Sequence, residues 1–277
     1  MDHNGQDLTA RGARLRELHR GPEPFVIANV WDAGSARLLG GLGFAALATT
    51  SGGLAHGLGR RDGAGLVSRE ETLRNASVIA AATDLPVSAD LEDGFGRAPE
   101  EVARTFMAAG ATGIVGGSVE DTTADPDAPI HEFGLAVERV RAAVEAARTL
   151  PFPFTVTARA ENHLYGRQDL EDTIRRLRAF EEAGADVLFA PGLPDADAIR
   201  AVCSSVGRPV NVLASGAAAG MSVAELGALG ARRISLGSGL SRSALAGALA
   251  AAREIAEEGT FGRMSAAASK SEIDGML

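Results

Sequence analysis

The sequence predicts a single (β/α)8 TIM barrel, and three observations indicate it. Short apolar runs alternate with helix-length amphipathic segments from residue 25 to residue 258. These strand–helix units number eight, the count of a closed barrel. Polar residues recur at alternate positions of several strands, which suits one polar interior and one apolar exterior under the helices. An open doubly wound sheet is the competing architecture, and the count of eight favours the barrel.

Each predicted strand is a short apolar run bounded by glycine, proline or polar residues. The runs are residues 25–28, 45–49, 86–90, 113–117, 154–158, 186–190, 209–213 and 233–236. Helical patterns lie between them, with apolar residues every three or four positions. They are residues 35–41, 68–82, 99–109, 133–149, 170–183, 195–205, 222–229 and 241–258.

Capping residues support several of these boundaries. Ser68 and Glu71 form a capping box, Asp195 and Ser222 are N-cap candidates, and Gly184 ends a helix. An extra N-terminal helix over residues 6–19 precedes the first strand, and we expect it to cover the barrel floor. Residues 1–277 therefore form one predicted domain, with residues 259–277 as a C-terminal tail.

The composition of the chain excludes some classes of binding partner. The net charge of −9 disfavours nucleic acid and anionic membranes as partners. Cys203 is the single cysteine, so no disulfide framework is expected and a reducing compartment suits the chain. No apolar run reaches the roughly 18–20 residues of a membrane span, and no secretory signal is recognised. We expect a cytoplasmic protein that binds a small molecule.

Carboxylates gather at the ends of two consecutive predicted strands. Strand alternation would place Asp90 and Glu92 on one face, with Glu120 in phase on the next strand. A single acid at a strand end is more often a helix cap or a solvated carboxylate, but three in phase favour a site. Converging acids without basic neighbours call for a hard divalent cation, Mg2+ foremost, with Mn2+ also suitable.

Two further motifs each leave two interpretations open. Residues 49–53, Thr-Thr-Ser-Gly-Gly, predict either a backbone nest for an anion or an ordinary glycine-rich turn. Arg159 is either a bidentate clamp for a substrate carboxylate or a structural ion pair to Glu161 or Glu120. His131, His163 and Tyr165 are weak candidates for a general base.

These residues resemble the isocitrate lyase/phosphoenolpyruvate mutase superfamily, in order and with matching spacing, from about residue 24 to residue 255. Residues 25–37 (FVIANVWDAGSAR) resemble its opening strand, and residues 57–63 (GLGRRDG) resemble the loop that carries an acid near the metal. Residues 90–96 (DLEDGFG) are similar to its D-x-[DE]-x-G-[YF]-G element. Residues 119–121 (VED) and 157–161 (TARAE) are similar to its [IV]-E-D and A-R-x-[DE] elements.

The resemblance implies a site and an assembly. Mg2+ would be held directly or through water by Asp62, Asp90, Glu92 and Glu120, and the catalytic residues would be Arg159, Glu120 and Asp62. A small carboxylate substrate would be bound by Trp31, Thr50, Ser51, Gly52, Arg159 and Asn211. Superfamily members often form tetramers that exchange the last helix. We therefore expect a homo-oligomer, a dimer or a tetramer, in which residues 241–258 and the tail are exchanged.

Two departures from the family pattern restrict the expected chemistry. Residues 122–131 (TTADPDAPIH) stand where isocitrate-cleaving members carry K-[KR]-C-G-H, so isocitrate or methylisocitrate cleavage is disfavoured. Pro191 stands where phosphonopyruvate-processing members have histidine and the lyases have glutamate.

We therefore expect a Mg2+-dependent lyase of a small 2-oxo or 2-hydroxy (di)carboxylic acid that works through a metal-stabilised enolate. Carbon–carbon cleavage or decarboxylation of an oxaloacetate-like substrate would be an example. One alternative is a P–C mutase or hydrolase acting on phosphonopyruvate or carboxyphosphonoenolpyruvate. The other alternative is a metabolite-binding protein without catalysis.

Overall fold

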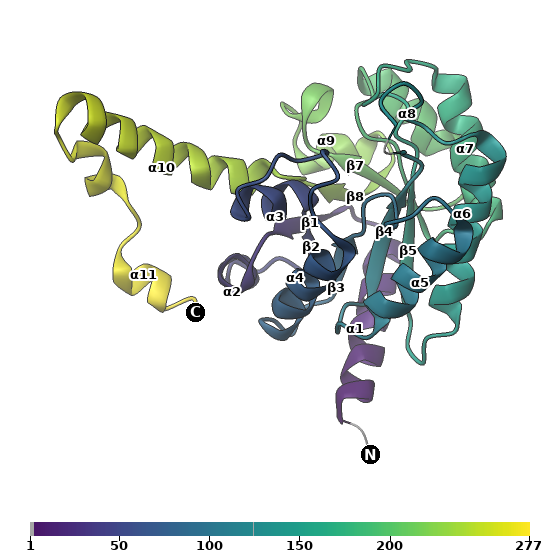
Figure 1. The fold of residues 1–277 in the computed structure, drawn as a ribbon, viewed down its shortest axis with the longest axis horizontal. Helices are drawn as coiled ribbons and strands as arrows, with labels where there is room; N and C mark the ends of the chain where they lie inside the picture. Colours follow the sequence, from purple (N-terminus) through teal and green to yellow (C-terminus); the bar gives the residue numbers. More distant parts are fainter. Residues whose placement is uncertain (1–2, 124) are drawn as a thin grey trace.

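Eight parallel strands form a closed barrel in chain order. The computed structural model describes residues 3–123 and 125–277. Each strand is hydrogen-bonded to the next one along the chain, and β8 closes the ring against β1. The strands are β1 (Phe25–Val30), β2 (Ala46–Thr49), β3 (Val87–Asp90), β4 (Gly116–Glu120), β5 (Thr155–Arg159), β6 (Val187–Phe189), β7 (Val210–Leu213) and β8 (Ala231–Ser235). The predicted (β/α)8 barrel is confirmed (Figure 1).

Helices follow the strands and surround the barrel on most sides (Figure 1). They are α2 (Ala33–Gly41), α3 (Ser51–Gly57), α4 (Arg69–Ala81), α5 (Pro99–Gly110), α6 (Phe133–Arg148), α7 (Leu170–Glu182), α8 (Ala196–Ser205), the short η1 (Gly216–Ala218), α9 (Val223–Ala228) and α10 (Gly239–Glu258). The capping box of Ser68 and Glu71 is present at the start of α4. No helix in the described part of the chain is long and apolar enough to cross a membrane.

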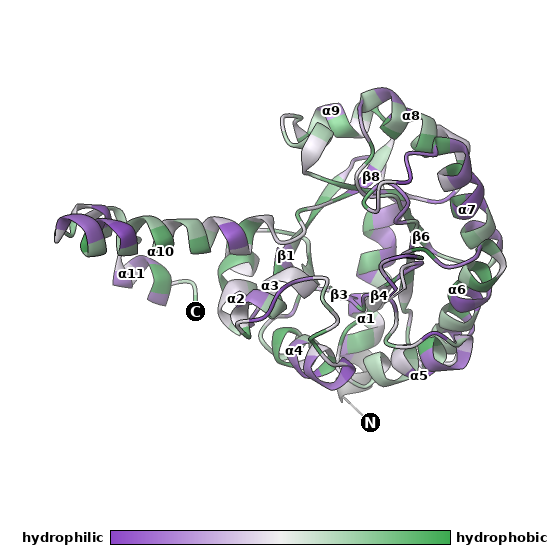
Figure 2. Ribbon diagram, turned by 45° about the horizontal axis from the view of Figure 1, so that its top comes forward, coloured by the Kyte–Doolittle hydropathy of each residue, from purple (hydrophilic) through white to green (hydrophobic). Residues whose placement is uncertain are grey.

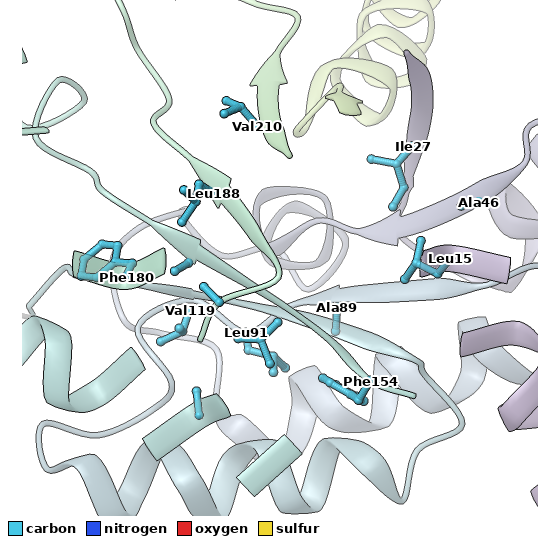
Figure 3. Packing of buried hydrophobic residues seen from close by; sticks show 14 of the residues in the cluster. Leu15, Ile27, Ala46, Ala89, Leu91, Val119, Phe154, Phe180, Leu188 and Val210 are labelled. Atoms are coloured by element: carbon cyan, nitrogen blue, oxygen red, sulfur yellow. The ribbon is translucent and has the colours of Figure 1, made fainter. Parts of the chain in front are cut away.

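Strand alternation sorts the side chains as the sequence predicts. Val119 and Leu188 belong to the apolar cluster of strand and helix side chains, some of which Figure 3 shows. Ser88, Ser118 and Asn211 have the polar character predicted for the interior, and they line a cavity inside the barrel. The apolar cluster therefore stabilises the ring from outside, and the interior is left for polar chemistry.

The N-terminal helix α1 (His3–Arg20) closes the floor of the barrel, as predicted. Its Leu15 is fully buried, and a Cβ atom built at Gly116, the first residue of β4, would lie 3.2 Å from the Leu15 Cδ2 atom. His19, near its end, packs edge-on against Phe25, the first residue of β1, with ring centroids 5.1 Å apart. Helix α1 thus covers the amino ends of the strands, opposite the site predicted at their carboxyl ends.

Two local predictions were wrong. The fourth strand was expected over residues 113–117, but β4 runs over Gly116–Glu120, because Gly113 adopts a left-handed turn (φ +89°) before it. Residues 51–57 were not expected to be helical, yet they form α3, capped by Thr50. A run of small residues gives no periodic apolar signal, which is why the pattern did not predict this helix.

Helix α10 projects away from the barrel (Figures 1 and 2). Ser241 is its one buried residue among those described, and Leu245 and Leu249 are about half exposed. The tail continues through η2 (Gly262–Ala266) and α11 (Lys270–Asp274) and returns to α2 of the same chain, where Arg37 donates a hydrogen bond to the carbonyl of Leu277.

Candidate active site

A cavity of about 170 Å³ opens inside the barrel. It is large enough for several water molecules or a small organic acid. All eight strands contribute lining residues; β4, β5 and β6 supply one each, namely Ser118, Arg159 and Phe189. Among the residues predicted for the site, those that line it are Thr50, Ser51, Gly52, Asp62, Asp90, Arg159 and Asn211.

Arg159 at the end of β5 lies at the centre of a buried ion-pair network. Its Nη1 atom is 2.9 Å from Glu120 Oε1 and 3.3 Å from Asp90 Oδ1. Its Nε atom donates to Glu161 Oε1 at 2.7 Å, and the guanidinium lies 4.9 Å from the centre of the Phe189 ring. The network makes Arg159 a paired cation, as the structural interpretation of this residue expects, while its side chain still borders the cavity.

The acids of this network lie in a site that disfavours negative charge. Burial raises the pKa of Glu120 well above its ordinary value, although Arg159 opposes the shift. Burial also raises the pKa of Glu161 against the effect of the same arginine. For Arg159, burial lowers the pKa, but Glu120, Glu161 and Asp90 outweigh it and raise the pKa above the ordinary range. One guanidinium therefore faces three carboxylates and does not neutralise them.

A backbone turn places Glu92 near these acids, and not the strand alternation that was predicted. Strand β3 ends at Asp90, so strand alternation does not place Glu92; a turn with φ +48° at Glu92 and +57° at Phe95 does. Such backbone angles in residues other than glycine cost about 1–2 kcal/mol each and often accompany functional sites. Burial, followed by the charges of Asp90, Asp93 and Asp62, raises the pKa of Glu92 to about 8.

Arg139 of α6 holds this turn and was not recognised in the sequence. It is fully buried and donates hydrogen bonds to the carbonyl groups of Asp93, Gly96 and Arg97, the last at 2.7 Å. Its place in a helical pattern gave no signal, because the carbonyls that it binds lie more than forty residues away in the chain. Arg139 positions the turn that carries Glu92.

The segment over residues 49–53, for which a backbone nest or a glycine-rich turn was predicted, leads into helix α3. The backbone N–H of Ser51 donates to Asp90 Oδ2 at 3.2 Å, and that of Gly53 donates to Thr50 Oγ1 at 3.3 Å. Gly52 instead makes room for Asp62, since a Cβ atom built there would lie 2.5 Å from Asp62 Oδ2. Helix α3 therefore brings Asp62, a residue of the following loop, to the edge of the cavity.

These acids fit a Mg2+ ion that keeps most of its water ligands. Among residues 3–123 and 125–277, no group of three or more His, Cys, Asp or Glu side chains is placed to enclose a metal directly. Mg2+ is usually bound through one or two carboxylates plus waters, so a complete protein cage is not required. Burial is the main cause of the raised pKa of Glu92, and the negative charges of Asp90, Asp93 and Asp62 raise it further; a hydrated dication would offset those charges.

Trp31 and Asn211 were both predicted to bind the substrate, and the structure places them differently with respect to the cavity. Trp31 is not among the cavity-lining residues of the described chain; its Cβ would lie 2.8 Å from a Cβ atom built at Gly53 of α3. Asn211 lines the cavity, but its amide is already engaged, accepting from Arg233 at 2.8 Å and donating to Ser235 at 2.9 Å. Arg233 was not predicted for the site, although its position two residues before Ser235 in β8 signals the same inward face.

The weak candidates for a general base lie outside the cavity lining. His131 borders a separate cavity of about 580 Å³, and burial lowers its pKa to about 4. Both ring nitrogens of His163 are buried without a hydrogen-bond partner among the described residues. Tyr165 is close enough to the acids for Glu120 and Glu161 to raise its pKa, after burial as the main cause.

Comparison with known proteins places this site in a family context. The model of the phosphoenolpyruvate phosphomutase family matches residues 15–256. A protein of Burkholderia cenocepacia J2315, described only as a lyase or mutase, has a structure with 50% identity and a TM-score of 0.94, covering 98% of this chain and 96% of that one. The 2-methylisocitrate lyase of Shewanella oneidensis is 30% identical over 205 residues, 72% of this chain and 68% of its own length.

A structure of oxaloacetate acetylhydrolase with the product oxalate is 26% identical, with a TM-score of 0.86, covering 97% of this chain and 94% of that one. The family model spans the barrel strands and the site residues described above. The chain therefore belongs to the phosphoenolpyruvate phosphomutase family, within the isocitrate lyase/phosphoenolpyruvate mutase superfamily of lyases and mutases.

Proposed function

We propose that this chain is a Mg2+-dependent lyase of a small 2-oxo or 2-hydroxy (di)carboxylic acid, for example an oxaloacetate-like substrate. One observation carries the proposal. Asp90, Glu120 and Glu161 pair with Arg159, while the charges of Asp90 and Asp62 reach Glu92, so the acids outnumber the cation beside a small polar cavity. Similarity to lyases named for methylisocitrate and dimethylmalate supports the substrate class.

Asp90, Glu92, Glu120 and Asp62 are the residues that would hold Mg2+. When bound, the ion supplies Lewis-acid polarisation of the keto oxygen of the substrate. Arg159 has a fixed orientation because three carboxylates and the Phe189 ring surround it. It therefore presents a constant charge to the cavity without rearranging during the reaction.

Tyr165 is our candidate for the donor of the final proton. Decarboxylation of a β-keto acid needs no base to begin, only a proton to complete it. Burial and the charges of Glu120 and Glu161 raise the pKa of Tyr165, so its phenol keeps its proton at neutral pH. We expect Tyr165→Phe to lower kcat with little effect on KM; an unchanged kcat would remove Tyr165 as the donor.

The decisive experiment is a Mg2+-supplemented activity screen of oxaloacetate, 2,3-dimethylmalate, citramalate and phosphonopyruvate. Turnover should disappear with EDTA and in Asp90→Ala, while Asp84→Ala, an exposed acid on the surface, should keep wild-type activity. Full turnover by a folded Asp90→Ala variant would contradict the metal assignment. Mg2+-dependent binding without turnover of any acid would favour the non-catalytic alternative.

Phosphonate chemistry is the second candidate, because the family model that matches is that of phosphoenolpyruvate phosphomutase. Arg97 and Arg167, two loop arginines that could neutralise a phosphoryl group, border the separate 580 Å³ cavity with His131 and not the central one. That placement favours the carbon–carbon lyase. Conversion of phosphonopyruvate, followed by phosphorus NMR, would reverse the ranking.

We also propose that α10 is exchanged between subunits of a homo-oligomer. In one chain this helix extends from the barrel with Leu245, Leu249 and Ile255 exposed, a patch that a neighbouring barrel would cover. The double variant Leu245→Asp/Leu249→Asp should be a monomer by light scattering after gel filtration. A wild-type chain that is itself monomeric would contradict the exchange.

A further inference from the structure

Arg233 is a buried cation without an anionic partner. It lies on β8, in register with Asn211 of β7 and Phe25 of β1, and it is 5% exposed. Its side chain lines the central cavity, and its Nε atom donates to Asn211 Oδ1 at 2.8 Å. Its Nη1 atom has no hydrogen-bond partner within residues 3–123 and 125–277, and no carboxylate of that part forms an ion pair with it.

This isolation contrasts with the other guanidinium of the cavity. Arg159 is paired with three carboxylates, whereas no carboxylate in the described part of the chain forms an ion pair with Arg233, and the charge of Arg159 acts on it repulsively. Burial, with that repulsion, lowers the pKa of Arg233 to about 9, so the side chain is still protonated at neutral pH. An uncompensated buried charge costs several kcal/mol, and a fold that retains one at a cavity wall is suited to an incoming anion.

The neighbours of Arg233 orient it toward the cavity. Asn211 accepts from Arg233 through Oδ1 and donates to Ser235 Oγ through Nδ2, so it holds both side chains in place. Because the Ser235 oxygen is the acceptor in that bond, its own proton is left to donate to a ligand. Arg233 and Ser235 thus present two donors to the same cavity.

The neutral group near Arg233, His19, does not balance the charge of Arg233 as an anion would. His19 of α1 is the other polar group whose environment includes Arg233, and its Nε2 atom also has no partner among the described residues. Its Nδ1 is hydrogen-bonded to the carbonyl of Leu15 at 2.7 Å, and burial, with Arg233, keeps the ring neutral. A water between His19 and Arg233 would satisfy hydrogen bonds but would leave the charge unmatched.

We propose that Arg233 binds the second carboxylate of the substrate, which makes this a site for dicarboxylates. Asp90 at the end of β3, with Glu120 at the end of β4 close behind it in the same ion-pair network, forms one pole of the cavity, and Arg233 on β8 forms the other, across the ring. A dicarboxylate would place one carboxylate near the metal-binding acids and direct the other down the barrel toward Arg233. This inference rests on the proposed function and specifies its substrate class.

The test compares three ligands that differ in one terminal group, titrated calorimetrically into the full chain with Mg2+ present. Succinate carries the second carboxylate, butyrate has a methyl group in its place, and 3-phosphonopropionate has a phosphonate. We expect succinate to bind at least about tenfold tighter than butyrate, the effect of a charge-assisted pair. Arg233→Met should abolish this preference and leave the affinity for butyrate unchanged.

Arg232→Met is the matched control, because Arg232 is the adjacent residue on the opposite face of β8 and does not line the cavity. It should keep the full preference for succinate. The melting temperature separates a binding role of Arg233 from a structural one. Without ligand, the Arg233→Met variant should melt at or above the wild-type temperature, because it lacks a buried unpaired charge. If this variant does not fold, Arg233→Lys should fold and retain part of the preference for succinate over butyrate.

Three results would overturn the inference: equal affinity of the wild type for succinate and butyrate, an unchanged succinate preference in Arg233→Met, or an Arg233-dependent gain for the phosphonate alone. These titrations require no turnover. Arg233-dependent succinate binding without lyase activity would therefore contradict only the proposed reaction, and lyase activity without it would contradict only the role of Arg233.

Discussion

Gly52→Ala tests whether helix α3 positions Asp62 for function. A Cβ atom at residue 52 would lie 2.5 Å from Asp62 Oδ2 and 3.1 Å from the Cβ atom of Ser238. Optimal contacts between carbon atoms are about 3.5–4.0 Å, so the carboxylate has to move. Asp62 is exposed, so it can move without breaking packed structure.

The expected magnitudes separate stability from function. Replacing a helical glycine by alanine gains up to about 1 kcal/mol, whereas overpacking costs about 1–3 kcal/mol. The net change in the free energy of unfolding should therefore stay within about 2 kcal/mol. Displacing a carboxylate near a bound metal, directly or through water, costs about 10- to 100-fold in metal affinity or activity. We therefore expect Gly52→Ala to lower the Mg2+ affinity by about this factor while the stability changes little.

The assay is Mg2+ titration calorimetry together with urea unfolding. Gly57→Ala, in the same helix, is the control, because no atom lies within 4 Å of a Cβ atom built there. Asp62→Ala should lose as much Mg2+ affinity as Gly52→Ala, and the double variant should lose no more than either, since both changes act on one carboxylate. Wild-type Mg2+ affinity in Gly52→Ala, or additive losses in the double variant, would refute the reasoning.

Three further predictions concern the barrel floor and the turn after β3. Burial lowers the pKa of His19 to about 3 in the folded state, whereas its value in the unfolded chain is about 6.5. As the pH drops from about 6.5 toward 3, the unfolded chain therefore binds a proton that the folded chain does not, and the free energy of unfolding falls. Between pH 8 and pH 5 the free energy of unfolding should drop by about 2 kcal/mol more in the wild type than in His19→Leu; equal pH slopes would show that His19 is not buried in the neutral form. Arg139→Met should cost about 3 kcal/mol by urea unfolding, because three carbonyls lose the one guanidinium that donates to them, and a loss below about 1 kcal/mol would contradict the role of this clamp. Gly12→Ala should lower the melting temperature by several degrees, because a Cβ atom would collide with the carbonyl oxygen of Pro153, whereas Gly134→Ala, in open space, should not.

The sequence by itself determined the architecture and the composition of the acid cluster. Alternating strand and helix patterns predict a barrel because each pattern is set by local chemistry, the two-residue period of a strand or the 3.6-residue period of a helix. The placement of Asp90 and Arg159 follows from the same rule, since the carboxyl ends of barrel strands meet at one mouth. Both residues line the cavity.

Only the tertiary structure decided how those residues are used. The two-residue period of a strand predicts side-chain directions only as far as the strand extends, so it did not predict the left-handed turn at Glu92, which follows the end of β3. The hydrogen bonds that Arg139 donates to this turn join residues far apart in the chain, so no local pattern signals them. Charge balance is likewise a property of three-dimensional neighbours. Arg159 and Arg233 both occupy inward positions of strands, yet Arg159 is surrounded by carboxylates and Arg233 is unpaired. The difference depends on which strands the closed ring brings together.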